Sequence, residues 1–479
     1  MKIDLRSARR PVAELPGQLR AVGVVSGALT EAGEALDAAA GGMLSKALKK
    51  GRFRGEEGET LLLWEGERYL LLVGLGGKRG VTPDRAREAA ARVAGEALRL
   101  GVREVAVENF WADRLGREAA SYAVAEGLHL GSYRFVKYRS GERPPRVRYW
   151  IARGRGRAVA EAAVLAGATL YARDLVNEPP NRMTPERLAE EARSLAGEAG
   201  LEAEVLGPQQ IEALGMGAFL AVARGSANPP RLVHLVYRPE KPRRRVALVG
   251  KGLCFDTGGY SLKPTESMRH MKADMAGAAA VLGVFRALAE LRPEVEVHGV
   301  IAAAENKISG GAYVVDEVVR AMNGKTIEVG NTDAEGRLTL ADALAYASRQ
   351  APDAVVSIAT LTGSAVVALG RKIAALFATD PRLREGIERA AAQEGEKVWP
   401  MPLEPSYKKL LRSQVADLAN VGTRHGGAIQ AALFLTEFAK GPYAHLDIAG
   451  PAFLPEAWEL GPAGGTGFGV RTLARWLKE

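Results

Sequence analysis

Cysteine and histidine are scarce in this sequence, which has one cysteine and six histidines among 479 residues. The single cysteine, Cys254, cannot form a disulfide within the chain, so the sequence favours a reducing compartment. We interpret Cys254 as a small buried side chain, because nothing around it indicates a nucleophile. No pair of histidines has the HExxH spacing, which excludes a single-zinc protease of that type.

Long hydrophobic runs are also missing. No stretch supplies the roughly 20 uninterrupted apolar residues of a membrane helix, and the start, MKIDLRSARRPVAELPG, has no apolar core of the kind that a signal peptide needs. With 47% apolar and 25% charged residues, the composition is typical of a globular protein. We therefore expect a cytoplasmic protein, and its length predicts more than one domain.

Positive charge is concentrated near the start of the chain. Residues 1–157 contain 29 Lys and Arg against 19 Asp and Glu, a net charge of +10, whereas the whole chain carries +9. Such a basic region can bind nucleic acid. No zinc-finger, RNA-binding or helix-turn-helix pattern accompanies it, so we prefer a solvated surface or a contact with an acidic neighbouring subunit. DNA binding through the basic N-terminal domain stays open as an alternative.

The first third alternates between strand and helix patterns. Apolar runs at 60–77 and 104–112 predict strands, and the apolar period of 87–101 predicts a helix between them. This order indicates an α/β domain with a partly parallel sheet. The segment GLGGKR at the end of the first run lacks the third glycine of a dinucleotide-binding loop, so we assign no nucleotide there.

A second domain is predicted to begin near residue 157. Residues 141–157 are rich in Arg, Gly and Pro, which indicates the approach to a linker, and 158–176 is expected to be the connecting helix. The predicted fold class is α/β with two domains. These are a smaller N-terminal α/β domain (1–157) and a C-terminal catalytic domain (158–479), whose mixed, largely parallel sheet lies between layers of helices. The expected strands of the second domain are 231–239, 244–252, 295–305, 325–331 and 354–363, and its expected helices include 269–290, 338–349 and 384–395.

Charged residues gather where three of these segments meet. The strand 244–252 continues into a glycine-rich loop with Asp256 and Lys263, and the strand 325–331 is followed by a loop with Asp333 and Glu335. Because ligands in such folds bind at the carboxyl ends of strands, we expect these side chains to share one rim of the sheet. The whole set comprises four carboxylates, two lysines and an arginine: Asp256, Asp274, Asp333, Glu335, Lys251, Lys263 and Arg337.

Taken singly, each of these residues has an ordinary structural explanation, such as a helix cap or a turn. Four carboxylates in one pocket, however, repel one another unless cations compensate their charge. Two divalent ions would do so, and oxygen ligands suit Mg, Mn or Zn. In two-metal hydrolases the ions lie about 3.5–4 Å apart, so the cluster favours a two-metal site.

The motifs that carry these residues resemble those of the leucyl aminopeptidase family, a family of dimetal exopeptidases. NTDAEGRL (331–338) is complete, and GKGLCFDTGGYSLKP (250–264) is followed by MKADMAGAAA (271–280). The resemblance implies a metallo-aminopeptidase that releases Leu, Met and other apolar N-terminal residues from peptides, assembled as a homohexamer. Further matching segments occur in the same order at 173–181, 304–329, 358–363, 416–422, 445–450 and 465–471.

The resemblance also implies a role for each gathered side chain. Two divalent metal ions per subunit, Zn or Mn with Mg and Co as alternatives, would be bound by Lys251, Asp256, Asp274, Asp333 and Glu335. Lys263 would polarise the scissile carbonyl, and Arg337 would hold a bicarbonate ion as general base. A lysine ligand must be neutral, so the pKa of Lys251 is expected to be strongly lowered beside two metal ions. The matched substrate-binding positions are Lys263, Met271, Thr360, Leu361 and Gly363.

One rival enzyme class begins from the segment FDTGG (255–259), which could be the phosphate loop of an actin-like or sugar-kinase ATPase. That fold needs a second loop of this type and an adenosine pocket, and it gives NTDAEGRL no role. The aminopeptidase interpretation is therefore preferred.

Overall fold

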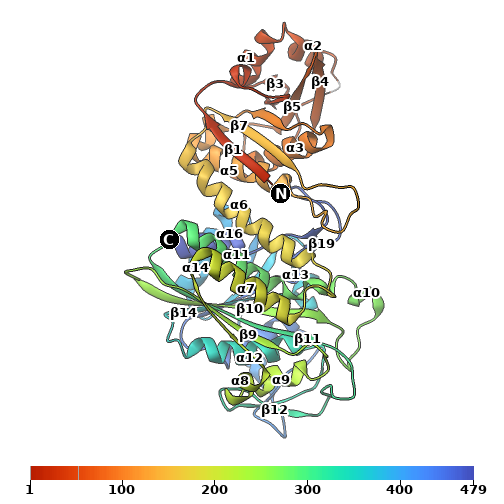
Figure 1. Cartoon of the computed structure of the whole chain (residues 1–479), viewed down its shortest axis with the longest axis vertical. Helices are drawn as coiled ribbons and strands as arrows, with labels where there is room; N and C mark the ends of the chain where they lie inside the picture. The colour runs from red at the N-terminus through yellow and green to blue at the C-terminus, as the bar shows by residue number, and fades with distance from the viewer. Residues whose placement is uncertain (1, 52) are drawn as a thin grey trace. The chain divides into compact units, whose positions relative to one another are not determined.

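The computed structural model describes residues 2–51 and 53–479. The chain divides into two compact units, Met1–Leu170 with Glu456–Ala463, and Tyr171–Pro455 with Gly464–Glu479. Both units are α/β, which confirms the predicted fold class (Figure 1). The boundary near 157 stays a prediction; residues 158–176 lie in the helix α6 (Gly156–Asn177).

The first unit is built on a seven-stranded sheet of order β1-β7-β6-β2-β5-β4, with β3 paired to β2. All neighbours from β1 to β5 along this order are parallel, and β4 is antiparallel to β5. The strands are β1 (Lys2–Ala8), β2 (Leu19–Val25), β3 (Ala28–Leu29), β4 (Thr60–Glu65), β5 (Arg68–Gly76), β6 (Glu104–Val107) and β7 (Arg146–Ala152).

Alternate residues of these strands are buried on opposite faces of the sheet. In β5, Leu71 and Val73 pack with the helices α3 (Pro83–Leu100) and α5 (Arg117–Gly131). Leu70 and Leu72 instead pack with α1 (Glu31–Ala39) and α2 (Met43–Lys49). The sheet is therefore covered on both faces, as the period of two along a strand requires.

The apolar run at 60–77 forms two antiparallel strands, β4 and β5, rather than one. Glu65 pairs with Arg68, and Gly66 between them has φ 60°. A positive φ is readily adopted by glycine, so the chain turns there and folds back on itself.

The second unit contains an eight-stranded sheet of order β16-β15-β18-β14-β10-β11-β9-β8. Its centre, β18-β14-β10-β11, is parallel, while β9 pairs antiparallel with both β11 and β8, as does β15 with β18. The sheet is thus mixed, as predicted. Its strands are β8 (Glu202–Leu206), β9 (Arg231–Tyr237), β10 (Arg244–Asp256), β11 (Val295–Asn306), β14 (Ala354–Ala359), β15 (Ala374–Ala378), β16 (Val398–Pro400) and β18 (Tyr443–Asp447).

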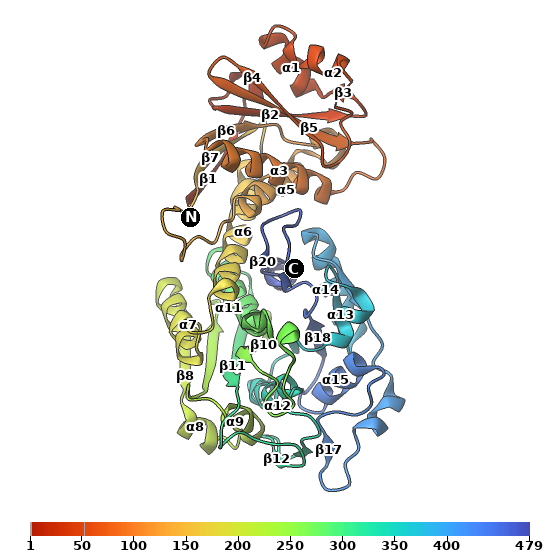
Figure 2. The ribbon, with the colours of Figure 1, turned by 90° about the vertical axis from the view of Figure 1, so that its right-hand side faces the viewer.

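Helices cover both faces of this sheet (Figures 1 and 2). The helix α11 (Ala276–Leu291) is almost entirely apolar and packs on β10 and β14 from one face. The helix α12 (Glu335–Ser348) is buried along its whole length and packs on β10, β11 and β14 from the other. Such burial on all sides explains why neither helix shows a strong polar face in its sequence. Further helices of this unit are α7 (Pro185–Ala199), α9 (Gly217–Ala223), α13 (Gly363–Leu369), α14 (Pro381–Glu394), α15 (Gly427–Thr436) and α16 (Val470–Lys478).

One expected strand lies outside the large sheet. The segment 325–331 contributes only β13 (Thr326–Glu328), which pairs with β12 (Val318–Arg320) and β17 (Leu418–Ala419) in a separate three-stranded sheet. Its sequence has the alternation of a strand, but periodicity does not reveal which sheet a strand joins. Within the described residues, no helix is long and apolar enough to cross a membrane.

Candidate metal centre

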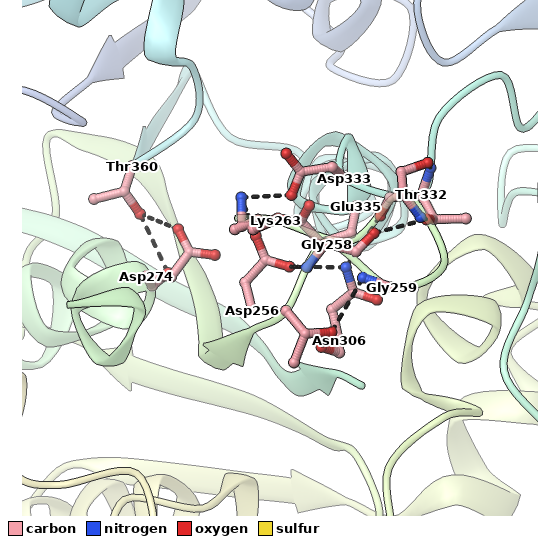
Figure 3. Close-up of polar contacts among 12 residues, drawn as sticks. Asp256, Gly258, Gly259, Lys263, Asp274, Asn306, Thr332, Asp333, Glu335 and Thr360 are labelled. Carbon is pink, nitrogen blue, oxygen red and sulfur yellow. Dashed lines mark hydrogen bonds and ion pairs between the residues drawn. The ribbon is translucent and has the colours of Figure 1, made fainter. Parts of the chain in front are cut away.

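The predicted metal ligands meet at the carboxyl end of β10 (Figure 3). β10 continues to Asp256 instead of ending at 252, so Lys251 lies within the strand and Asp256 is its last residue. Asp274 lies in the short 3-10 helix η2 (Met271–Met275), directly before α11, because His270 with φ 70° interrupts the expected helix 269–290. Glu335 and Arg337 lie in the first turn of α12 rather than in a loop.

Lys251 joins two of the carboxylates. Its Nζ lies 2.8 Å from Asp274 Oδ1 and 2.8 Å from Glu335 Oε1, and it donates to the carbonyl oxygen of Thr360 at 3.1 Å. The side chain is only 3% exposed. In the protein by itself, the ammonium group therefore supplies part of the positive charge that these buried carboxylates need.

Lys263 joins the other two carboxylates. Its Nζ lies 2.9 Å from Asp256 Oδ2 and forms a second ion pair with Asp333. Oxygen atoms of Asp256, Asp333 and Glu335 all lie within 4.8 Å of one another, which is a spacing that can hold a metal ion. The four predicted carboxylates and both lysines thus form one connected cluster.

Burial and mutual repulsion change the pKa values of this cluster. Burial, then the charge of Asp256, raises the pKa of Glu335 to about 8 even though Lys251 and Lys263 oppose the shift. Burial likewise raises the pKa of Asp274 and of Asp333. The two lysines therefore do not fully compensate the negative charge of the carboxylates, as expected for a site that takes up further cations.

Lys251 does not have a lowered pKa in the protein by itself. Burial acts to lower its pKa, but the charges of Asp274, Glu335 and Asp256 outweigh burial and raise it. The same balance raises the pKa of Lys263, where burial is opposed by Asp256, Glu335 and Asp333. A metal ion could use the Lys251 amine only after displacing its proton.

Two glycines allow the close packing around this cluster. A Cβ on Gly336 would lie 2.5 Å from Lys251 Cε. A Cβ on Gly258, which has φ +85°, would lie 2.5 Å from the carbonyl oxygen of Ser261. Larger residues at either position would displace the lysine or the loop after β10.

A network of hydrogen bonds that sequence analysis missed orients Asp256. Its Oδ1 accepts bonds from Gly258 N and from Asn306 Nδ2, both at 2.8 Å, and the same Nδ2 donates to the carbonyl oxygen of Thr332 at 3.0 Å. Thr332 Oγ1 donates to the carbonyl oxygen of Gly258 at 2.7 Å (Figure 3). Asn306 is the last residue of β11, so the strand-end argument used for Asp256 could have found it.

Arg337 is buried beside the cluster. Its Nη1 donates to the carbonyl oxygen of Asn420 at 2.7 Å, whereas Nε is buried and has no hydrogen-bond partner among the described residues. Burial lowers its pKa to about 10, although Glu335 and Asp447 act in the opposite direction. The guanidinium group remains charged at neutral pH and has a donor available for a small anion.

The predicted substrate-binding positions differ in how closely they approach the acidic cluster. Thr360 Oγ1 donates to Asp274 Oδ1 at 2.7 Å, and Leu361 N donates to Asp447 Oδ1 at 3.1 Å. Met271 is partly buried in η2, and Gly363 begins α13. Among the described residues, no hydrogen bond or ion pair joins Met271 or Gly363 to the carboxylates. Cys254 is buried, as predicted, and burial raises the pKa of its thiol.

Family models match most of the chain. Residues 170–474 match the "Cytosol aminopeptidase family, catalytic domain", and residues 21–142 match the "Cytosol aminopeptidase family, N-terminal domain". The chain therefore belongs to the cytosol aminopeptidase family, and the predicted resemblance is confirmed. Membership makes it an aminopeptidase, a hydrolase whose substrates are peptides.

Individual relatives agree with this assignment. A "Probable cytosol aminopeptidase" of Persephonella marina is 44% identical over 465 residues, which cover 93% of this chain and 93% of the relative. A solved tomato leucine aminopeptidase mutant superposes with a TM-score of 0.91 at 37% identity and covers 100% of this chain and 96% of its own. The "Bottromycin maturation enzyme BotP in complex with Mn" has a TM-score of 0.88 at 41% identity, covering 97% of this chain and 99% of its own.

Proposed function

We propose that this aminopeptidase releases leucine, methionine and other apolar N-terminal residues from peptides with the help of two divalent metal ions. The observation that supports the proposal most directly is the convergence of Asp256, Asp333 and Glu335, whose oxygens lie within 4.8 Å of one another. A purely structural cluster of this kind would need more positive charge than Lys251 and Lys263 supply.

The donor atoms fit metal binding. Asp274 Oδ2 and Glu335 Oε2 are both buried and accept no hydrogen bond among the described residues, although a buried carboxylate oxygen normally has a partner. We propose that Lys251, Asp256, Asp274, Asp333 and Glu335 hold the two ions, with Asp256 and Glu335 shared. When bound, a pair of divalent ions supplies Lewis acidity that activates water and polarises a carbonyl group.

The manganese in the related BotP structure supports Mn as one metal of this site, and the mixed amine and carboxylate ligands also suit Zn, with Mg and Co as alternatives. The naming of the relatives as cytosol aminopeptidases supports a cytoplasmic location for this chain too.

Lys263 and Arg337 act on the substrate in this proposal. The pKa of Lys263 is raised, so the side chain stays protonated. Its ammonium group can then donate to the carbonyl oxygen of the scissile bond and stabilise the negative charge that develops there. The buried Nε–H of Arg337 has no hydrogen-bond partner among residues 2–51 and 53–479, which fits a small anion such as bicarbonate serving as general base. Asn420 fixes the guanidinium group through its carbonyl oxygen at 2.7 Å.

The preference for apolar N-terminal residues rests on Met271, Thr360, Leu361 and Gly363. Thr360 contacts Asp274 directly, so residues that follow β14 line the same site as the metal ligands. A flexible thioether such as Met271 adapts to aliphatic side chains of different shape. We expect discrimination between aliphatic residues to be modest, because one methylene is worth about 1–3 kcal/mol.

Hydrolysis of leucine p-nitroanilide tests the proposal. The purified protein is assayed with bicarbonate before chelation, after chelation, and after addition of manganese or zinc. We expect chelation to abolish activity, metal to restore it, and the folded Glu335→Ala variant to remain inactive with metal. Glu212→Ala, which changes an exposed carboxylate of the same unit, is the matched control. Full activity in the chelated protein or in the Glu335→Ala variant would exclude the two-metal mechanism.

We propose a homohexamer as the assembled form. Large apolar side chains are exposed around the loop after β10 and the segment after β11, and such surface normally becomes buried on association. Light scattering of the purified protein measures the mass, and a monomer in solution contradicts this assignment. The exposed side chains concerned are Tyr260, Leu262, Ile308, Val314, Val315 and Val318.

DNA binding by the basic N-terminal region stays a prediction from its net charge of +10, with 29 basic against 19 acidic residues in 1–157. Electrostatic binding to duplex DNA weakens steeply with salt. A gel-shift titration at several salt concentrations measures this dependence, and absence of binding at low salt removes the prediction.

A further inference from the structure

The first unit contains a cavity of about 440 Å³ that the proposed peptidase reaction does not use. Its lining includes residues at or just after the carboxyl ends of β2, β5, β6 and β7, which run parallel to one another. Volumes of about 300–1,000 Å³ are typical of small-molecule sites. The cavity is therefore large enough for a small metabolite.

The cavity lies where the order of the strands reverses. β2 and β6 are neighbours in the sheet, but the chain continues from β2 through α1 and α2 to β4 and β5 on one side. From β6 it continues through α5 to β7 on the other side. Open parallel sheets bind their ligands in the crevice formed by such a reversal. Thr30 and Glu31 lie at the start of α1, after β2 and the short β3, and Glu108 and Trp111 follow β6; all four line the cavity.

Glu108 is the most deeply buried charged group of this lining. Glu108 is only 9% exposed. Its Oε2 accepts hydrogen bonds from Gly23 N at 2.7 Å and from Thr30 Oγ1 at 2.8 Å. Among the described residues, no donor reaches its Oε1. Burial raises the pKa of Glu108 to about 7, so a cation beside it would stabilise the ionised form.

Trp111 adds a sign of local strain. It is 3% exposed and has φ 60°, a left-handed conformation that a bulky residue rarely adopts. Such strain persists where the surroundings hold a residue in place and is concentrated at ligand sites.

The charges around the cavity balance. The lining contains three acidic residues, Glu31, Glu108 and Asp113, and three basic residues, Lys78, Arg117 and Arg153. Arg153 pairs with Glu31 at 2.8 Å, whereas neither Lys78 nor Arg117 forms an ion pair within the described part of the chain. A polyanion such as a nucleotide would place its phosphates near three carboxylates, so a ligand with both charges suits the lining better.

We propose that this cavity binds a small apolar zwitterion, an amino acid such as leucine or a dipeptide, with its ammonium group at Glu108 and its carboxylate at Lys78 and Arg117. Val25, Leu29 and Leu75 supply the apolar contacts for its side chain. An amino acid is also the product of the proposed peptidase reaction, but the cavity argument does not depend on that reaction.

Calorimetric titration of the full-length, metal-loaded protein with leucine, and separately with AMP, tests this site. The variants are Lys78→Ala, Arg117→Ala and Glu108→Gln, and Lys50→Ala, an exposed lysine that does not line the cavity, is the control. Because each cavity variant removes a charge-assisted hydrogen bond, we expect leucine to bind about tenfold or more weakly to it. Hydrolysis of leucine p-nitroanilide should be unchanged in the lysine and arginine variants, which distinguishes this site from the metal centre.

Two results would overturn the proposal. The first is leucine binding that is absent, or equal in the wild-type protein and all three cavity variants. The second is AMP binding that exceeds leucine binding and is lost in the Lys78 and Arg117 variants, which would assign the cavity to phosphorylated ligands. The lysine and arginine variants change exposed side chains, so they remain informative if Glu108→Gln fails to fold.

Discussion

Glu335→Gln should change how the stability of the metal-free protein depends on pH. The carboxyl group has a pKa of 4.5 in an unfolded chain and about 8 in the fold, chiefly because of burial and the charge of Asp256. Between these two values the folded state binds one proton more than the unfolded state. The free energy of unfolding therefore falls as pH rises, by about 1.4 kcal/mol per pH unit from this group alone.

Glutamine cannot ionise, so the variant loses this contribution while keeping the shape of the side chain. We expect the variant to be more stable than the chelated wild-type protein, by a margin that widens by about 2.5 kcal/mol between pH 5.5 and pH 7.5. This margin counts the titration of Glu335 alone; the pKa values of Asp274 and Asp333 are also raised, and both groups titrate together with Glu335 in the same cluster.

Denaturant unfolding of the chelated proteins at pH 5.5, 6.5 and 7.5 measures this margin. Glu212→Gln, which neutralises an exposed carboxylate in the same unit, should follow the wild-type curve at every pH. If the free energies of unfolding of the wild-type protein and Glu335→Gln changed with pH in parallel, the reasoning would be refuted. Such a result would mean that Glu335 is ionised in the folded protein at pH 5.5.

Three further predictions concern metal and substrate. Addition of manganese to the chelated protein should release protons, and fewer at pH 9 than at pH 7, because Glu335 is already ionised above about pH 8. Calorimetry in buffers of different ionisation enthalpy counts the released protons. Equal numbers of protons at the two pH values would contradict the expectation. Asn306→Ala removes the 2.8 Å hydrogen bond to Asp256 and should weaken metal activation by about 10–100-fold, with activity recovered at high metal concentration. An unchanged dependence of activity on metal concentration would show that Asn306 does not orient Asp256. Lys263→Met should lower kcat by about 10²–10³-fold while the metal content measured by elemental analysis is retained, and a normal kcat would exclude Lys263 as the group that stabilises the developing charge.

Much of the site was visible in the sequence because its residues follow strands and lie within short, unusual motifs. The sequence predicts that Asp256, Asp333 and Glu335 share one rim of a sheet, and in the structure their oxygens lie within 4.8 Å of one another. Asp333 and Glu335 do not reach this rim at the end of a strand of the large sheet, as predicted, because β13 belongs to a separate small sheet and Glu335 begins α12. Glu335 still lies beside Asp256 because α12 packs directly on β10.

Other features could not be predicted from spacing. The bond between Asn306 and Asp256 joins residues 50 positions apart, and Asn420, which holds Arg337, is 83 positions from it. The hairpin within 60–77 was hidden by the apolar side chains on both sides of Gly66. Local patterns specify elements, whereas such pairings depend on how distant elements pack.

The sequence by itself determined the α/β class, the acidic composition of the candidate metal centre and the family, because periodicity and motifs are local properties of the chain. Only the tertiary structure decided the charge balance of that cluster, in which the buried Lys251 and the partly buried Lys263 pair with four carboxylates, and the pKa values that follow from it. The cavity at the carboxyl ends of β2 and β6 also exists only in the fold. Burial and distance set both properties, and neither is written in the order of residues.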